Sequence, residues 1–180
     1  TIFDALNEAS TLFNFQEEKS FCVTTEAMRV AHNASEILES IYTAFGLRFE
    51  IISGEQEAHY TALAIERALW RENISSDAYA LFDLGGGSTE ITLRDAYGRK
   101  SRSFPFGIVT TAERFKENVA ENIETLIESI SPWIDSFGKI PNTYHQLIAT
   151  AGTPTTVAAF LQGLDYAHYD PEKVNGTCLH

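Results

Sequence analysis

The sequence lacks the features that mark membrane-spanning and secreted chains. No apolar run approaches the roughly 18 residues that a membrane span requires, and the first residues do not form the basic-then-apolar pattern of a secretory signal. Only two cysteines are present, Cys22 and Cys178, and they lie far apart without metal-ligand spacing. We therefore expect inert thiols and a cytoplasmic protein.

Basic residues are also scarce. The chain has 13 lysines and arginines against 25 aspartates and glutamates, so its formal net charge at pH 7 is −12. Nucleic-acid backbones attract basic surfaces, and this balance argues against a nucleic-acid partner. The five histidines include no pair with metal-ligand spacing. We expect neither a nucleic acid nor a membrane among the partners.

Hydrophobic residues make up 44% of the chain, as in ordinary globular proteins, and their spacing predicts alternating helices and strands. The predicted helices comprise residues 2–13, 26–31, 33–46, 55–71, 109–131 and 153–164. The predicted strands comprise residues 20–25, 48–52, 78–84, 89–95, 100–106 and 146–150. Because strands alternate with helices and one antiparallel meander is inserted, the predicted fold class is α/β.

Four residues carry specific signals for helix ends. Asn33 and Glu36 have capping-box spacing, which predicts a helix start, and Gly46 suits the C-cap of the same helix. Pro132 is expected to end the helix that begins near residue 109, because proline cannot donate a helical hydrogen bond. Residues 132–142 are then expected to form a loop.

The stretch LFDLGGGSTEITL, residues 81–93, places three consecutive glycines between two predicted strands. Glycine inside a strand marks a bulge or a place where a ligand approaches the backbone closely. Consecutive N–H groups in such a turn form a concave nest that favours anions, and Ser88 and Thr89 add hydroxyl donors. The loop has neither the G-K-[ST] of a Walker P-loop nor a GxGxxG pattern. It favours phosphate binding over a tight hairpin with a glycine bulge.

Two carboxylates flank the glycines. Asp83 ends the incoming strand and Glu90 is near the start of the outgoing one. In phosphate sites Mg²⁺ is usually held by one or two carboxylates together with water and the substrate's own oxygens. The pair is therefore a candidate metal site, and two solvated acids at a hairpin are the alternative.

The stretch IISGEQEAHYTALAIERALW, residues 51–70, leads from a predicted strand into a helix, with Glu55 and Glu57 in its first turn. The helix dipole stabilises acids there by about 0.3–1 kcal/mol, which alone could explain them. Small residues surround Glu57 along the helix, however, so this helix could approach a second lobe closely. A carboxylate facing a phosphate loop could orient and deprotonate an attacking water, and both interpretations stay open.

Five segments, in this order, resemble the exopolyphosphatase/guanosine pentaphosphatase family, a branch of the actin, sugar kinase and heat-shock ATPase superfamily. The segments are VTTEAMRVAHN, FEIISGEQEA, LFDLGGGSTEI, SFPFGIVTTAERF and IATAGTPTTVAAFL. The resemblance spans residues 21–176 and implies two ribonuclease-H-like (actin-like ATPase) lobes around a cleft. Residues 1–62 would be the remainder of an incomplete first lobe, and residues 63–180 a second lobe cut short at its C-terminal end.

The resemblance also implies roles for individual residues. Glu57 matches the base that activates water, and Arg29 matches an arginine that contacts substrate phosphate. Asp83 and Glu90 match the acids placed near Mg²⁺. The second phosphate-binding loop matches Gly85, Gly86, Gly87, Ser88 and Thr89. The stretch TAGTPTT lies where relatives in the superfamily hold a nucleotide, or is only a helix start here.

Such a protein would hydrolyse the terminal phosphoanhydride bond of inorganic polyphosphate, of guanosine pentaphosphate or of both, with Mg²⁺ as cofactor. Its full-length form is compatible with a homodimer. A kinase of the same superfamily, transferring phosphate from ATP to a small acceptor, is one alternative. A non-catalytic module that senses guanosine alarmones or polyphosphate is another, although a pure binder would not need Glu57 as a base.

Departures from the family pattern modify these expectations. No D-x-G-S-N-S first phosphate loop precedes the resembling segments, so we expect a fragment of a longer protein with weak or no activity by itself. Gln56 stands where many relatives carry glutamate and His59 where they often carry arginine, which together with the net charge favours a shorter substrate. A solvated hairpin face is expected for the basic residues Arg94, Arg99, Lys100 and Arg102.

Overall fold

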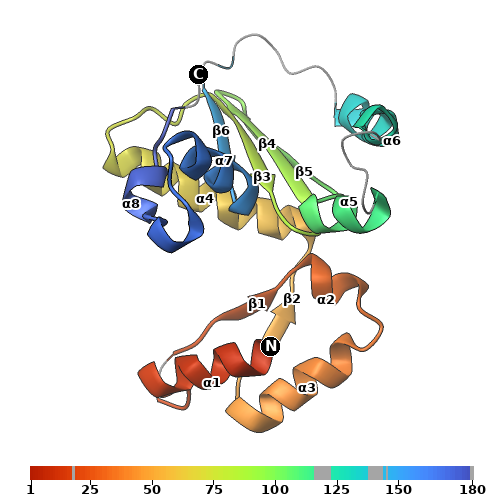
Figure 1. Ribbon diagram of the computed structural model, residues 1–180, viewed down its shortest axis with the longest axis vertical. Coiled ribbons are helices and arrows are strands. Elements are labelled where there is room, and N and C mark those ends of the chain that lie inside the picture. The colour runs from red at the N-terminus through yellow and green to blue at the C-terminus, as the bar shows by residue number, and fades with distance from the viewer. Residues whose placement is uncertain (18, 116–122, 138–143, 145, 179–180) are drawn as a thin grey trace. The chain divides into compact units, whose positions relative to one another are not determined.

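The computed structural model (Figure 1) describes residues 1–17, 19–115, 123–137, 144 and 146–178. The chain divides into two compact units, Thr1–Ser53 and Gly54–His180, and each unit has its own sheet. Within the described residues, no helix combines the length and apolar character that crossing a bilayer demands.

The first unit contains a two-stranded parallel sheet and three helices (Figure 1). In chain order its elements are α1 (Ile2–Leu12), β1 (Cys22–Thr24), α2 (Glu26–Val30), α3 (Ala34–Phe45) and β2 (Phe49–Ile51). The two strands pair in parallel, with Cys22 opposite Phe49 and Thr24 opposite Ile51. A parallel pair needs a crossover connection, which α2 and α3 supply. The helices and strands predicted for this region are present, with somewhat shorter strands.

Both ends of α3 lie where the sequence predicts them, with Asn33 as N-cap and Gly46 as C-cap, but the predicted cap hydrogen bonding is found at the C-terminal end only. Gly46 takes a left-handed conformation with φ of 72°, and its N–H donates to Tyr42 O at 2.8 Å. The capping box predicted at Asn33 is wrong, because within the described part of the chain its side chain makes no capping hydrogen bond. A capping side chain reaches first-turn amides from an extended backbone, whereas ψ of Asn33 is 18°. Thr1 and Asp4 form a complete capping box at α1.

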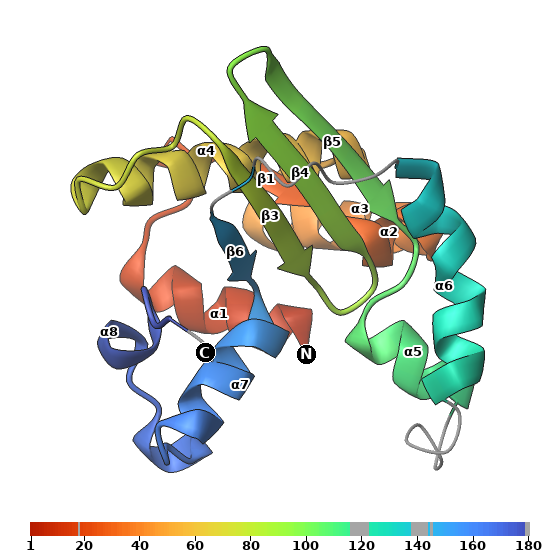
Figure 2. The same cartoon turned by 90° about the horizontal axis from the view of Figure 1, so that it is seen from above.

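The second unit is built on a mixed sheet with strand order β5-β4-β3-β6 (Figure 2). In chain order its elements are α4 (Gly54–Arg71), β3 (Tyr79–Leu84), β4 (Thr89–Asp95), β5 (Gly98–Phe104), α5 (Ile108–Phe115), α6 (Ile123–Phe137), β6 (Leu147–Thr150), α7 (Gly152–Leu161), a 3₁₀ turn (Tyr166–His168) and α8 (Pro171–Val174). β3, β4 and β5 form the predicted antiparallel meander, and β6 joins parallel to β3. The α/β fold class is confirmed.

The helix end predicted at Pro132 is wrong. α6 continues to Phe137 and holds Pro132 in its interior, so residues 132–137 are helical instead of forming a loop. The remainder of that expected loop, residues 138–142, lies outside the described residues. Proline removes one backbone donor and strains the preceding turn, but a single missing hydrogen bond does not compel a helix to stop.

The two faces of the second sheet bury different side chains. One face holds an apolar cluster of Ala80, Ile91, Leu93 and Phe104. On the other face α4 packs across β3, β4 and β5, and Ala62 of this helix contacts the buried side chains of Tyr79 and Leu81. Since strand side chains alternate between faces, the face under α4 also receives Asp83, near the end of β3.

The division between the two compact units differs from the expected lobe boundary. It falls after Ser53, whereas the boundary expected between residues 62 and 63 lies inside α4. This helix is uninterrupted and its Ala62 belongs to the core of the second unit, so the whole helix folds with that unit. The assignment of residues 1–62 and 63–180 to two lobes stays a prediction.

Candidate functional site

The glycine run forms the connection between β3 and β4. Leu84 and Thr89 are the last paired residues of the two strands, and the Gly85 N–H closes the loop by donating to Ser88 O at 3.1 Å. Gly86 is exposed and Ser88 is buried. The loop is therefore open to solvent at its tip and anchored in the interior at its end.

The carbonyl and amide groups of this loop have different surroundings. The first turn of α5 donates backbone hydrogen bonds to Gly85 O at 3.1 Å and to Gly86 O at 2.9 Å. In the part of the chain that the structure describes, the N–H groups of Gly86, Gly87 and Ser88 donate no hydrogen bond. Three successive backbone donors are thus available to a ligand, which is the property of an anion-binding nest.

Asp83 and Glu90 lie opposite each other on the hairpin, beside the loop. They are cross-strand partners, and such partners have Cβ atoms about 4.5–5.5 Å apart on one face of the sheet. The Thr61 hydroxyl, from α4, donates to Asp83 Oδ2 at 2.8 Å. The Ser103 hydroxyl, from β5, donates to Glu90 Oε1 at 2.6 Å. One helix and three strands therefore position this pair of carboxylates.

Glu90 is 2% exposed, and burial raises the pKa of its carboxyl group above the usual range. Hydrogen bonds from Ser103 and Ser88 lower the pKa, while the negative charges of Glu57 and Asp83 raise it. The resulting direction is upward. Glu90 is therefore close enough to both carboxylates for repulsion, and a cation at this position would relieve it.

Glu57 lies in the first turn of α4, four residues before Thr61. Residues four apart share a helix face, so Glu57 is on the side of α4 from which Thr61 binds Asp83. The start of α4 lies directly against β5, because a Cβ added to Gly54 would overlap the side chain of Ser103. These contacts bring Glu57 to the loop end of the sheet.

Arg29 belongs to the first unit, so its expected contact with substrate phosphate stays a prediction. Its Nε donates to Glu26 Oε2 at 2.9 Å, and its Nη1 donates to Ile52 O at 2.7 Å. The guanidinium is thus held in a defined position by a carboxylate and a backbone carbonyl of the same unit.

Among the described residues, the carboxylates that flank the glycine loop are a pair, Asp83 and Glu90. The described residues contain no group of three histidine, cysteine, aspartate or glutamate side chains that could hold an ion. The pair Asp83 and Glu90 nevertheless fits Mg²⁺, because this ion commonly takes one or two carboxylates and completes its shell with water and phosphate oxygens. The repulsion that acts on Glu90 supports the same fit.

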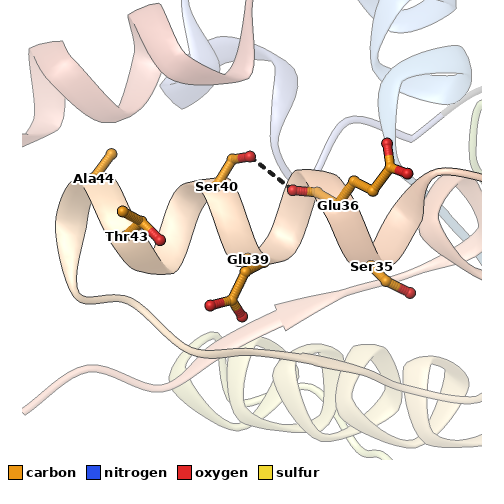
Figure 3. Close-up of a pocket in the computed structure, with 6 residues that line it drawn as sticks. All are labelled: Ser35, Glu36, Glu39, Ser40, Thr43 and Ala44. Atoms are coloured by element: carbon orange, nitrogen blue, oxygen red, sulfur yellow. Dashed lines mark hydrogen bonds between the residues drawn. The ribbon is translucent and has the colours of Figure 1, made fainter.

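A surface pocket elsewhere, along α3 in the first unit, contains none of the predicted site residues (Figure 3). It is lined by one helix alone, through Ser35, Glu36, Glu39, Ser40, Thr43 and Ala44. Figure 3 shows the carboxylates of Glu36 and Glu39 pointing apart. A single helix face without convergent polar groups offers no chemistry comparable to that of the glycine loop.

Sequence reasoning missed Thr61 and Ser103, the two residues that hold the site acids. Thr61 could have been found from its spacing of four after Glu57, and Ser103 from the hairpin register, which places it opposite Glu90. Gly54 carried no signal in the sequence, because its role depends on how closely α4 approaches β5.

Comparisons with known proteins point to one family. A sequence profile of the Ppx/GppA phosphatase family matches residues 3–176. A bifunctional 3-dehydroquinate synthase/phosphatase of Fusobacterium nucleatum is 26% identical over 174 residues, which cover 91% of this chain and 25% of that protein. A guanosine-5'-triphosphate,3'-diphosphate pyrophosphatase of Photobacterium profundum is 26% identical over 167 residues, which cover 87% of this chain and 32% of that protein.

The fold gives the same answer. The crystal structure of the Aquifex aeolicus member of the Ppx/GppA family matches with a TM-score of 0.71 and 32% identity, over 97% of this chain and 56% of that chain. The present chain therefore spans a quarter to a third of the curated relatives' length and 56% of the solved one. Because the family profile covers nearly all of its residues, the chain belongs to the Ppx/GppA phosphatase family.

Proposed function

We propose that this chain carries part of the active site of a hydrolase that removes the terminal phosphate of guanosine pentaphosphate or inorganic polyphosphate. The carrying observation is the meeting, at one end of the second sheet, of a carboxylate cluster and a loop whose three successive N–H groups find no acceptor among the described residues. Membership of a phosphatase family supports the reaction type. The pyrophosphatase named among the relatives supports the substrate class.

The glycine loop would bind the phosphoryl group that is removed. The N–H groups of Gly86, Gly87 and Ser88 can donate to its non-bridging oxygens, and the two glycines present no side chain that would block the approach. The hydroxyl of Thr89 donates to Phe106 O at 2.7 Å, so we assign Thr89 to holding the loop. Phosphoryl-transfer catalysis depends chiefly on preorganised donors of this kind, aimed at the charge that develops in the transition state.

Asp83 and Glu90 would hold Mg²⁺, with water and substrate oxygens as the other ligands. When bound, the ion would offset the charge on the phosphate oxygens. Thr61 and Ser103 orient these two carboxylates through their hydroxyl hydrogen bonds. Without a cation, a polyanionic substrate would meet three carboxylates, and this repulsion is a physical reason to expect metal dependence.

Glu57 would act as the general base. As the oxygen of water bonds to the terminal phosphorus, the bond from phosphorus to the bridging oxygen breaks, and Glu57 accepts the proton that water loses. The products are orthophosphate and a chain shorter by one phosphate. Arg29 would add positive charge at the substrate.

The surroundings favour a short substrate such as guanosine pentaphosphate over long polyphosphate. The net charge is −12, which disfavours a long polyanion. Among the basic residues of the meander, Arg99 is already engaged by other side chains. Arg99 Nη1 lies 3.4 Å from Glu66 Oε1, and its Nη2 lies 2.6 Å from His59 Nδ1. An arginine already engaged by a carboxylate attracts a long polyanion weakly.

The test is phosphate release by the full-length protein from polyphosphate and guanosine pentaphosphate, measured side by side with Mg²⁺. Glu57→Gln should lower kcat by about 10²–10⁴-fold and leave the unfolding temperature nearly unchanged. Glu55→Gln is the matched control, because Glu55 is an exposed acid in the same turn of α4.

Two results would contradict the proposal. An active enzyme that is indifferent to Glu57→Gln would remove the assignment of the base. Phosphorylation of an added acceptor from ATP, without release of free phosphate from either substrate, would indicate the kinase.

A further inference from the structure

The start of α5 holds every carbonyl of the glycine run. Gly85 O accepts from the Ile108 N–H at 3.1 Å. Gly86 O accepts from the next two amides of α5 at 2.9 and 3.3 Å, and Gly87 O lies 3.5 Å from the hydroxyl oxygen of Thr110. The first turn of this helix, where amides normally lack partners, is therefore used to fix the loop.

Thr110 links the helix start to the loop through one hydroxyl group. Its Oγ1 accepts from the Gly107 N–H at 2.8 Å, and its proton is shared between Gly107 O at 3.1 Å and Gly87 O at 3.5 Å. Gly107, the residue before α5, also lies so close to the loop that there is no room for a side chain at this position. A Cβ on Gly107 would overlap the carbonyl oxygens of Gly85 and Gly86.

This attachment determines where the loop's amides point. The described peptide bonds are all trans, and in a trans peptide the C=O and the following N–H point in opposite directions. The carbonyls of Gly85, Gly86 and Gly87 are directed toward the start of α5. The N–H groups of the same three peptide bonds, which belong to Gly86, Gly87 and Ser88, are therefore directed away from it.

The same attachment makes these amides better donors. Hydrogen bonds in a chain polarise one another, and a carbonyl that accepts a bond strengthens the N–H of its own peptide group. The first amides of α5 already donate to the loop carbonyls. The positive end of the α5 dipole therefore acts on a ligand indirectly, through the peptide groups of the loop.

We propose that Gly107 and Thr110 are positioning residues of the phosphate loop, which hold its carbonyls against α5 so that three successive amides face the phosphate. The inference rests on the proposed function for the identity of the ligand. Its geometric part, the orientation of the amides, stands on the hydrogen bonds alone.

The experiment compares Thr110→Val, which keeps the shape and removes the hydroxyl, with Thr110→Ser, which keeps the hydroxyl. Thr111→Val is the matched control, because Thr111 is the next residue of α5 and its hydroxyl makes no hydrogen bond in the described part of the chain. Inorganic pyrophosphate with Mg²⁺ is the probe. Binding is followed in the full-length protein by the NMR shifts of the Gly86, Gly87 and Ser88 amides.

The wild type, Thr110→Ser and Thr111→Val should show the three amides shifting at similar pyrophosphate concentrations. Thr110→Val should need about tenfold more pyrophosphate, with kcat/KM on the substrate lowered by a similar factor and an unfolding temperature close to that of Thr111→Val. Gly107→Ala should weaken binding at least as much. If Gly107→Ala does not fold, the comparison of Thr110→Val with Thr110→Ser and Thr111→Val still tests the proposal.

Thr110→Val binding as tightly as Thr111→Val would overturn the proposal. The proposal would also be overturned if Thr110→Ser bound pyrophosphate as weakly as Thr110→Val. It would likewise be overturned if the NMR shifts of the three wild-type amides did not change when pyrophosphate is added. A wild type whose amides respond but which releases no phosphate from either substrate would overturn the proposed function and leave the positioning role intact.

Discussion

α4 covers one face of the second sheet, and the charged side chains at the two ends of that face are arranged differently. At the end far from the glycine loop, Glu66 Oε1 accepts from the Tyr79 hydroxyl at 2.8 Å and lies 3.4 Å from Arg99 Nη1. At the loop end, Asp83 and Glu90 are bound by hydroxyl groups, and like charges surround Glu90. Charge is paired with opposite charge at one end and concentrated at the other.

We interpret this difference as one between a structural end of the sheet and the proposed functional end. Burial and the neighbouring Glu66 raise the pKa of Tyr79 to about 12, so its hydroxyl remains a donor to Glu66 at neutral pH and the far end is satisfied by the chain itself. At the loop end the chain supplies hydroxyl donors to both acids, and we expect a bound cation to offset their charge. A fold does not gain stability from crowding carboxylates, so that end is where a ligand is expected.

Among the changes that compare the two ends of the sheet, Glu90→Gln should have the largest effect, with opposite signs on activity and stability. We expect phosphate release to fall by about 100-fold, because one of the two carboxylates proposed to hold Mg²⁺ is lost. The unfolding temperature without Mg²⁺ should rise, because Gln can still accept from Ser103 and no longer carries a desolvated charge. Phosphate assays and thermal unfolding check the two halves, and a loss of both activity and stability would contradict a functional role for the loop end.

The same variant also predicts a pH dependence. A group whose pKa is raised on folding contributes stability that is complete below its unfolded pKa, about 4.3 for Glu, and is lost as pH rises through the folded value. Relative to Glu90→Gln, the wild type should therefore lose stability as the pH rises above about 4 in the absence of Mg²⁺. Urea unfolding of both proteins as the pH is raised measures the difference in their free energies of unfolding. If the wild type instead became more stable relative to Glu90→Gln as the pH rises, the prediction would be wrong.

Gly54→Ala should destabilise the loop end by about 1–3 kcal/mol, because the added methyl overlaps Ser103. Gly152→Ala is the matched control, since Gly152 also begins a helix and an added Cβ there meets nothing within 4 Å. Urea unfolding gives both free energies. Ser103→Gly should relieve most of the loss in the double variant, and full additivity of the two changes would show that the overlap is not the cause.

Glu66→Gln should have the smallest effect and the opposite sign to Glu90→Gln on stability. Gln can still accept from Tyr79, but the ion pair with Arg99 is lost, which costs about 0.5–1 kcal/mol for a pair that is partly exposed. The unfolding temperature should fall by about 2–4 °C per kcal/mol, with phosphate release unchanged. A rise in stability would erase the contrast between the two ends.

Local pattern was sufficient for most elements and for the position of the glycine loop. The strand–glycine–strand sequence around residues 81–93 places the loop between β3 and β4, and the apolar spacing of residues 55–71 predicts α4, because both depend on neighbours in sequence. Local signals were misleading at Pro132, which does not end its helix, and in part at Asn33, where the helix starts as predicted but without the capping hydrogen bond. There the backbone conformation and the surrounding helix outweighed a single residue's preference.

Which residues support the loop could be inferred only in part. Ser103 follows from hairpin register once the turn is known. The overlap that a side chain on Gly54 or Gly107 would create, and the bonds from α5 to the loop carbonyls, join segments far apart in the chain. No spacing rule predicts how closely two such segments approach.

The sequence by itself determined the chemistry available to this protein: flexible amides between two strands, two acids beside them, and a glutamate at a helix start, because residue type and spacing set what a segment can donate or accept. Only the tertiary structure decided that α4 and β5 gather the acids at one end of a sheet and that α5 turns the loop's carbonyls one way and its amides the other. That decision belongs to packing, since the direction of a peptide group depends on the partner that holds it.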